Sequence, residues 1–543
     1  MLQSRLPTDI LDGILWSLQA LVLILAWRAG RRTGEEPEPS LTPERCLIAI
    51  LVAWIWRLIY LFVLSSRGFA YLVPDDVARW LLSWGWSVSP YLISWDGIWQ
   101  GGTFYVHGAA MALLRDPLVA SKFVAAFSNL LPLIGIFVLT QGLYRSSRLS
   151  AVAVVAAAPW WLPILLGTGA MTETPVTGLF LTGVGLLLIA LDERTADRAS
   201  GRALIGAALF FFASTAYHLL AWMMLASFLL VFARRLMTSP KAAVRRRLPL
   251  FLVVSFAYCV VWSLGCWIKF GSPLAFLTAY DANNLKHGLR LSMALRARAF
   301  PLAFLYDAWL FLPALGVGVI AAFGKGDETR RRERLVIGGA VASLALLTTA
   351  AIIGSAPNTR PERNALVVVS ACFPIAVAAL ARAWMSEARP FRPSGSGRSS
   401  VVVLSLALAW VAVNHARTFE RVRSQQTLDP DAVATGTWLR EALGQPDADG
   451  RFPPEDVVHV WVAPSTAYPD YSILYLFGSP ARTRHHQAAE TEEEVLSSVA
   501  PGEWLVTDRP LTPSDLETVR RIGKYQLFRR TDSSSDRRIQ PPP

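Results

Sequence analysis

The chain has 543 residues, of which 53% are hydrophobic and only 17% are charged, and its mean hydropathy is +0.38. Soluble globular proteins carry about 25% charged residues, so this composition excludes an ordinary soluble domain and indicates a polytopic membrane protein. The net charge of +12 comes mainly from short arginine-rich loops between apolar runs. Because no basic stripe carries interleaved aromatic residues, no nucleic-acid partner is expected.

Hydropathy predicts about twelve membrane-spanning helices, each near the roughly 20 residues that cross a bilayer. They are expected at residues 10–28, 46–65, 119–143, 150–167, 175–191, 202–216, 218–233, 249–268, 301–322, 335–354, 364–384 and 400–414. The first run is followed by arginines and lacks a small-residue cleavage site. We therefore expect a retained helix there rather than a cleaved signal peptide.

The charges of the loops predict the orientation of these helices. Basic residues such as Arg145, Arg234 and Arg330 fall in one alternate set of loops, which should face the cytoplasm. The other set then faces outward, together with the C-terminal region: 66–118, 168–174, 269–300 and 355–363. The chain is expected in the inner or plasma membrane of a cell. Arg417, on the outer side, is an exception to the trend that basic residues face the cytoplasm.

Two domains and a tail are predicted. Residues 1–415 form a helical membrane domain, with interfacial helices in its first outer loop, 66–118. Residues 416–530 mix a helical pattern, 433–443, with strand-like runs, and predict a small extracytoplasmic α/β domain. Residues 531–543 are expected to be disordered. The predicted fold class is therefore mainly α, with a small α/β domain at the C-terminal end.

Two adjacent carboxylates, Asp75 and Asp76, open the first outer loop directly after an apolar run. Charges near hydrocarbon are costly to hold, so their presence indicates chemistry. Apolar residues then recur at helical spacing, at Val77, Trp80, Leu81 and Trp84. This spacing predicts a helix that lies along the membrane interface with its tryptophans among the headgroups. The alternative is that Asp75 only caps this helix.

Further polar residues in the outer loops are candidates for the same site. They are Asp96 and His107 in the first loop, Glu173 in the loop 168–174, Tyr217 and His218 at a tight turn, Lys286 and Arg290 in the loop 269–300, and Arg360 and Arg363 before a late span. Structural alternatives remain open: Glu173 could be a first-turn acid at a helix N-terminus, and His218 a satisfied structural histidine. The outer cations oppose the charge trend and therefore need a reason.

Acids on one loop and cations on others suit the transfer of a group from a phosphate. A carboxylate can remove a proton from an acceptor hydroxyl, which contributes about 10²–10⁴-fold in rate. Arginine and histidine side chains can hold an anionic phosphate leaving group. Adjacent carboxylates resist ionising together, so the pKa of one of them can rise.

This layout resembles the GT-C glycosyltransferases, in particular the bacterial relatives of protein O-mannosyltransferases and lipid A aminoarabinose transferases. The similar elements are the pair Asp75-Asp76, the stretch Met171-Thr172-Glu173-Thr174-Pro175, the stretch from Trp267 to Leu274, the late Arg360 or Arg363, and the C-terminal outer domain. An Arg-Tyr-Glu-like stretch of the family corresponds here to Ala216-Tyr217-His218, which lacks the arginine.

The resemblance implies an inverting transfer of a sugar from a polyprenyl-phosphate donor to a glycan, lipid or protein acceptor. Asp75 would be the general base, Asp76 its partner, and Glu173 a residue that positions the acceptor. The phosphate and substrate would be bound by residues of the other outer loops: Asp96, His107, Tyr217, His218, Lys286, Arg290, Arg360 and Arg363. No cofactor is certain, and a divalent cation, Mg or Mn, held by Asp76 and Glu173 is left open. No set of side chains has spacing diagnostic of a bound ion.

Two other functions remain as alternatives. A transporter or flippase of a lipid-linked sugar would place ionisable residues inside the membrane, whereas the predicted spans contain few charges. A GT-C scaffold that binds a glycolipid without catalysis is the second alternative, because the family arginine is missing.

Overall fold

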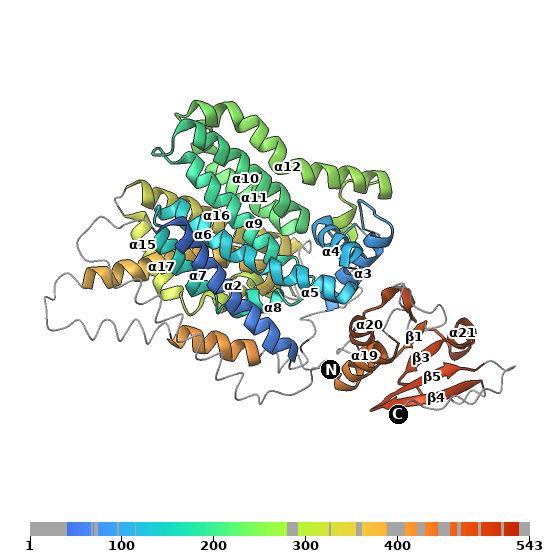
Figure 1. The fold of residues 1–543 in the computed structure, drawn as a ribbon. Helices are drawn as coiled ribbons and strands as arrows, with labels where there is room; N and C mark the ends of the chain where they lie inside the picture. Colours follow the sequence, from blue (N-terminus) through green and yellow to red (C-terminus); the bar gives the residue numbers. More distant parts are fainter. Residues whose placement is uncertain are drawn as a thin grey trace.

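The structure, a computed structural model, describes residues 41–66, 69, 74–94, 97–114, 116–279, 292–324, 327–353, 361–387, 408–420, 429–443, 457–463, 469–486, 490–511 and 515–531. Several predictions fall outside these ranges: the span 10–28, the candidates Asp96, Lys286, Arg290 and Arg360, and almost all of the tail 531–543. Within the described ranges the chain forms a large helical bundle and a smaller sheet-containing unit near the C-terminal end (Figure 1).

Eight helical segments in the described ranges are long and apolar enough to cross a membrane. They are α2 (Pro43–Ser66), α5 with α6 (Pro117–Ser128 and Leu130–Tyr144), α9 (Glu173–Leu191), α10 (Asp197–Tyr217), α11 (Leu219–Met237), α12 (Ala242–Phe270), α16 (Glu328–Ile353) and α17 (Pro361–Glu387). A ninth span results if the bent pair α14 (Met293–Ala308) and α15 (Leu312–Phe323) is counted once. The chain is thus a multi-pass membrane protein, and the predicted span 10–28 and the first half of the predicted span 400–414 lie outside the described residues.

Two predicted spans differ in the structure for a local reason. The run 150–167 is divided into α7 (Ser147–Ala157) and α8 (Trp161–Leu166), with Pro159 in the break between them. Proline cannot donate a helical hydrogen bond and disfavours helix at the residue before it, so Pro159 favours a break at this point. The run 301–322 falls on α14 and α15, which meet at a bend of 103°.

Helix α9 lies in the interior of the bundle and packs between α6 and α10. Glycines on α9 allow α6 to approach closely: a Cβ atom at Gly178 would lie 2.1 Å from the carbonyl carbon of Leu131, and one at Gly185 would lie 2.6 Å from that of Val138. Small residues permit such close helix contacts within a membrane. This packing fixes the position of Glu173, the first residue of α9.

A buried arginine on α2 ties three helices together. The Arg57 guanidinium donates to the carbonyl oxygens of Asn129 (3.0 Å), Ala157 (3.0 Å) and Ala158 (3.4 Å). These carbonyls belong to the C-terminal ends of α5 and α7. Helix C-termini carry partial negative charge, so these carbonyl groups stabilise the buried cation.

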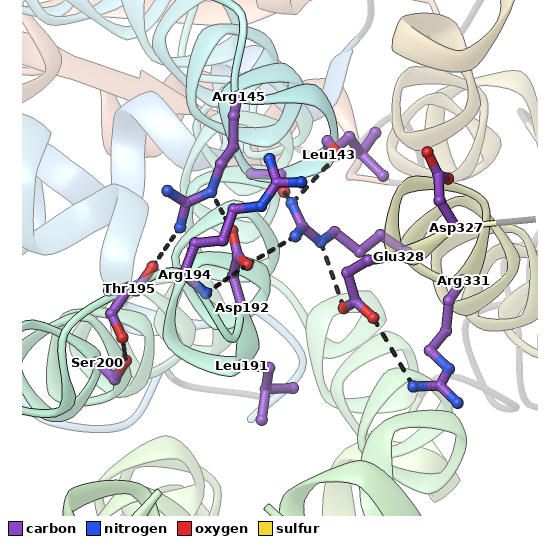
Figure 2. A network of polar contacts seen from close by, with 12 residues as sticks. Leu143, Arg145, Leu191, Asp192, Arg194, Thr195, Ser200, Asp327, Glu328 and Arg331 are labelled. Atoms are coloured by element: carbon purple, nitrogen blue, oxygen red, sulfur yellow. Dashed lines mark hydrogen bonds and ion pairs between the residues drawn. The ribbon is translucent and has the colours of Figure 1, made fainter.

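The loops predicted to share the cytoplasmic side meet at one end of the bundle, which we call the basic end. Asp192, the buried C-cap of α9, pairs with Arg145 at the end of α6 and with Arg332 of α16 (2.8 Å). Glu328 of α16 pairs with Arg332 and with Arg235 of α11. Figure 2 shows Asp192 next to Arg145, and Glu328 next to Arg331. This network joins four helices by side chains at their ends.

The C-terminal unit is a five-stranded mixed sheet with helices against it. Its elements are α19 (Pro430–Leu443), β1 (Val458–Trp461), α20 (Pro469–Phe477), a short 3₁₀ turn (Pro480–Arg482), β2 (Thr483–His485), α21 (Glu492–Ser498), β3 (Trp504–Thr507), β4 (Leu516–Ile522) and β5 (Tyr525–Arg530). The strand order is β2-β1-β3-β5-β4, with β1 parallel to both of its neighbours and β5 antiparallel to both of its own. The predicted mainly α fold with a small C-terminal α/β unit is confirmed.

This unit packs against α3 (Pro74–Val88), the helix that carries the acidic pair (Figure 1). Tyr475 of α20 contacts Trp80 edge to face, with ring centroids 5.3 Å apart. Arg440 of α19 also pairs with Asp116 (2.6 Å). Trp80 is fully buried and donates to the Pro117 carbonyl (3.1 Å), so the expectation that this side chain lies among lipid headgroups is wrong. The apolar face of α3 packs against the C-terminal unit, α4 (Gly101–Leu114) and α5.

Candidate active site

The acidic pair lies in the first turn of α3. The helix begins at Pro74, whose fixed φ suits the first helical position, and Asp75 and Asp76 follow. The alternative that Asp75 only caps this helix does not fit the structure, because Asp75 already lies within the first helical turn. Acidic side chains in a first turn are stabilised by the partial positive charge of the helix end.

An arginine joins the two acidic segments that the sequence separates by about a hundred residues. Arg363, in the first turn of α17, donates from Nη1 to Asp75 Oδ2 (2.9 Å). Its Nε and Nη2 atoms both donate to Glu173 Oε1, at 2.8 and 2.5 Å. Glu173 is buried, whereas the Asp75 side chain keeps 41% of its surface exposed. We call Asp75, Glu173 and Arg363 the charged triad, and the end of the bundle where it lies the acidic end.

The triad keeps Asp75 ionised. Burial raises the pKa of Asp75. The positive charges of Arg363 and Arg79, together with the hydrogen bond from Arg363, lower it by a larger amount. The pKa of Asp75 therefore lies below its ordinary value. An exposed carboxylate that stays ionised at neutral pH can accept a proton from a bound hydroxyl group.

Asp76 points into the protein rather than toward the triad's exposed carboxylate. It is fully buried, and a Cβ atom at Gly169 would lie 2.5 Å from Asp76 Oδ1. Lys122 of α5 donates to the Thr168 carbonyl (2.6 Å) and is near enough to Asp76 for their charges to attract. These contacts fasten the loop 167–172 to the start of α3, which gives Asp76 a supporting position behind Asp75.

Arg79 was missed as a candidate by sequence reasoning. It follows Asp75 by four residues, so both lie on one side of α3, and this spacing was the available signal. Its guanidinium is buried, contacts Met171 Sδ (3.2 Å) and lies over the Trp99 ring, 4.8 Å from the centroid. Both partners are weak compared with a carboxylate. Among the described residues no carboxylate is bonded to the Arg79 guanidinium, although its charge acts on Asp75, so its N–H groups can bind an anion at the acidic end.

His218 caps α11 and has a defined tautomer. The Leu220 backbone N–H donates to His218 Nδ1 (3.0 Å), so in the neutral ring the proton is on Nε2. Burial lowers the pKa of His218 to about 4, and Arg79 and Arg363 act in the same direction against the charge of Glu173. At neutral pH this side chain is an uncharged donor from Nε2.

A small pocket opens between α3, the start of α4 and the α10–α11 turn. Its polar and aromatic lining consists of Arg79, Trp99, Gln100, Thr172, Tyr217 and His218. Thr172 adjoins Glu173, which links the pocket to the charged triad. The structure thus brings Asp75, Glu173, Tyr217, His218 and Arg363 to one end of the bundle, as the sequence predicts.

His107 lies elsewhere. It is buried within α4 and shares a hydrogen bond with Ser121 Oγ of α5 (3.1 Å). Burial, together with the charge of Arg79, lowers its pKa to about 3. The structure places it in a helix contact and not in the lining of the pocket.

Lys269 supports the same region from α12. Its ammonium group donates to the carbonyl oxygens of Ile93 (3.1 Å) and Ser94 (3.0 Å). The stretch Trp267–Leu274, noted for its resemblance to a family loop, therefore holds the segment that leads into Trp99 and Gln100.

The side chains present do not fit a divalent cation at Asp76 and Glu173. Among the described residues, no group of three or more His, Cys, Asp or Glu side chains is arranged to hold a metal ion. Glu173 is bonded to Arg363, whose positive charge occupies the place that a cation would take.

The bundle with its charged end and C-terminal unit has the fold of the GT-C membrane glycosyltransferases. The chain is similar to ArnT from Cupriavidus metallidurans bound to undecaprenyl phosphate, with a TM-score of 0.58, 12% identity, and coverage of 89% of this chain and 97% of that one. The apo form of that ArnT gives a TM-score of 0.56 at 13% identity, covering 89% of this chain and 96% of that one.

An apo oligosaccharyltransferase from Archaeoglobus fulgidus matches with a TM-score of 0.50 at 13% identity, covering 85% of this chain and 69% of that one. No protein-family model and no curated protein matches the sequence. At these identities the likeness concerns the fold, and it confirms the predicted GT-C architecture.

Proposed function

We propose that this protein is an inverting glycosyltransferase that moves a sugar from a polyprenyl-phosphate donor to an acceptor hydroxyl. The acidic end would face outward, because the arginine-rich loops of the basic end favour the cytoplasm. The fold shared with ArnT, which binds undecaprenyl phosphate, supports a lipid-linked donor. The observation that carries the proposal is an exposed, ionised Asp75 in the same end of the bundle as the Arg79–His218 pocket.

The reaction needs a base on one side of the sugar and anion-binding groups on the other. Asp75 would take the proton of the acceptor hydroxyl as its oxygen bonds to the anomeric carbon. The bond from that carbon to the phosphate oxygen breaks, and the phosphate leaves with the electron pair. Arg79 and the Nε2–H group of His218 would bind the leaving phosphate.

Arg363 has a different role in this proposal from the one implied by the family resemblance. Three of its nitrogen atoms already donate to Asp75 and Glu173. It would therefore orient the base and hold its pKa low, and Arg79 would replace it at the phosphate. Glu173 would fix Arg363, and the acceptor would approach Asp75 from its exposed side.

The test is a single-turnover assay with the purified full chain and a radiolabelled polyprenyl-phosphate sugar. Asp75→Asn should lower the transfer rate by about 10²–10⁴-fold, the usual contribution of a general base. Folding should persist, because Arg363 keeps its buried partner Glu173. Asp197→Asn, in the first turn of α10 at the basic end, is the matched control and should retain full transfer.

Transfer that survives in Asp75→Asn would contradict the assignment of the base. Translocation of the donor across vesicles without any transfer by the wild type would instead favour the flippase alternative. Binding of the donor with neither outcome would favour a non-catalytic scaffold.

A further inference from the structure

The Gln100 side chain is buried in the pocket without a partner. It is 5% exposed, and among the described residues neither its amide nitrogen nor its amide oxygen makes a hydrogen bond. Buried polar groups in folded proteins are almost always hydrogen-bonded, because a buried polar group without a hydrogen bond destabilises the fold. An amide with both ends unpaired, facing a pocket, is prepared for a ligand.

The position of Gln100 is fixed by the start of α4. The next residue, Gly101, donates its backbone N–H to the Tyr258 hydroxyl of α12 (2.9 Å). At Gly102 a Cβ atom would lie 2.9 Å from the carbonyl group of Ala216 and 2.8 Å from the Tyr217 ring. Because glycine permits this approach, the start of α4 is held directly against the end of α10, where Tyr217 and His218 line the same pocket.

The chemistry of the amide selects the kind of ligand group. Its nitrogen can only donate and its oxygen can only accept. A phosphate oxygen accepts hydrogen bonds and would leave the amide oxygen unpaired. A hydroxyl group both donates and accepts, so hydroxyl groups of a sugar satisfy both ends. This conclusion does not depend on which way the amide is turned, because both of its atoms lack partners.

We propose that Gln100 binds a hydroxyl group of the donor's sugar and thereby determines which sugar is transferred. This inference rests on the proposed function, in which Arg79 and His218 bind the adjacent phosphate. The sugar would lie between the phosphate and Asp75, with one hydroxyl directed toward Gln100. Trp99 supplies the apolar wall next to it.

The experiment compares Gln100→Met with the wild type on undecaprenyl-phosphate-linked mannose, glucose and arabinose and on their mono-deoxy analogues. The wild type should prefer a parent sugar over one of its deoxy analogues by about 10–100-fold in kcat/KM, the discrimination expected from one buried hydrogen-bonding group. Gln100→Met should abolish that preference and leave the rate with the deoxy analogue unchanged. Gln141→Met, on α6 at the basic end, should keep the wild-type preference.

A binding measurement separates this inference from the proposed reaction. Phosphonate analogues in which carbon replaces the glycosidic oxygen cannot transfer their sugar, and their affinity can be measured by tryptophan fluorescence. Wild type that prefers the hydroxylated phosphonate, with the preference lost in Gln100→Met, supports the sugar site even if no transfer occurs. Two results would overturn the proposal for Gln100 and leave the transferase proposal intact. One is an equal loss of affinity for every deoxy analogue, and the other is a preference for the hydroxylated phosphonate that Gln100→Met retains.

Discussion

Arg363 is the residue on which the acidic end depends most, because it is the bonded partner of two carboxylates that come from different helices. The guanidinium matches this task, since it offers several donors in one plane and stays charged when buried. Glu173 by contrast is buried so deeply that its charge is tolerable only with this partner.

A pair of substitutions tests this dependence. Arg363→Met leaves the Glu173 carboxylate buried without its cation and should lower the free energy of unfolding by about 3–5 kcal/mol. The double variant Glu173→Met/Arg363→Met removes both charges and should recover most of that stability while remaining inactive. Scanning fluorimetry of the purified protein measures the unfolding midpoint. A double variant as unstable as the single one would show that the pair is not the cause.

The pKa values of Asp75 and His218 predict the pH dependence of transfer. The pKa of Asp75 lies below its ordinary value of about 3.9, and that of His218 is lowered to about 4. Since both folded pKa values are depressed, Asp75 stays ionised and His218 neutral as the pH falls from 7. The stability linked to these forms is fully present above the unfolded pKa values, about 6.5 for histidine and about 3.9 for aspartate, and it is lost as the pH falls from those values through the folded ones.

We therefore expect kcat/KM to show no acid limb near pH 6.5, the approximate pKa of an unperturbed histidine. Arg79→Gln removes a charge that lowers the pKa of Asp75, so the acid limb should move to higher pH. Arg440→Gln, at the contact of the C-terminal unit, should leave the limb in place. A wild-type limb near pH 6.5 would contradict the assigned states of both groups.

At this scale the sequence identified the charged triad's members but not their arrangement. Asp75, Glu173 and Arg363 were predictable because a charge at a membrane boundary is unusual whatever its neighbours are. Their pairing depends on helix packing over almost 300 residues, which no local pattern encodes. Gln100 gave no signal at all, since an isolated glutamine has meaning only when its burial and its missing partners are known.

At the scale of elements, the contact of α9 with α6 determines where Glu173 lies. Gly178→Ala would place a Cβ atom 2.1 Å from the carbonyl carbon of Leu131, and backbone cannot yield as a side-chain end can. Overpacking of this kind costs about 1–3 kcal/mol or more, so the unfolding midpoint should fall. Gly316→Ala, on α15, meets no atom within 4 Å and should raise stability by about 0.5–1 kcal/mol. If both variants behaved alike, close packing would not explain the Gly178 result.

The elements that hydropathy predicted well are the uninterrupted ones, such as α9, α11 and α17. Hydropathy predicted a single span where the structure has two helices with a break between them, as in α7 and α8 or in α14 and α15. Apolar content measures whether a segment tolerates hydrocarbon, but the direction of the helix is set by proline and by packing. The amphipathic face of α3 shows the same limit, because a face that suits lipid suits a protein surface equally well.

At the scale of the whole molecule, the C-terminal unit is in direct contact with the helix that carries the proposed base. Tyr475→Ala should remove the ring that packs on Trp80 and lower kcat by about 10-fold or more, with little change in KM, because a small displacement of a reacting group is costly. Tyr475→Phe keeps the ring and should restore kcat. Hydrogen exchange of the α3 amides should increase only in the alanine variant.

The ion pair at the same contact provides a control for this prediction. Arg440 and Asp116 are each about one-third exposed, and such pairs contribute only about 0–1 kcal/mol. Arg440→Gln should therefore have a small effect on kcat. Full turnover by Tyr475→Ala would show that α3 keeps its position without the C-terminal unit.

The arginine at position 57 has a consequence for how the protein is made. Ribosomes deliver α2 before any of the carbonyl groups that bind its guanidinium, which come from residues 129, 157 and 158. A lone arginine in the middle of an inserting helix costs about 2.5–3.5 kcal/mol at the translocon. Helix α2 is thus expected to be stably inserted only when α5 and α7 pack against it. The helices from α2 to α7 are therefore expected to insert as a group, and Arg57→Leu should let α2 enter the bilayer alone.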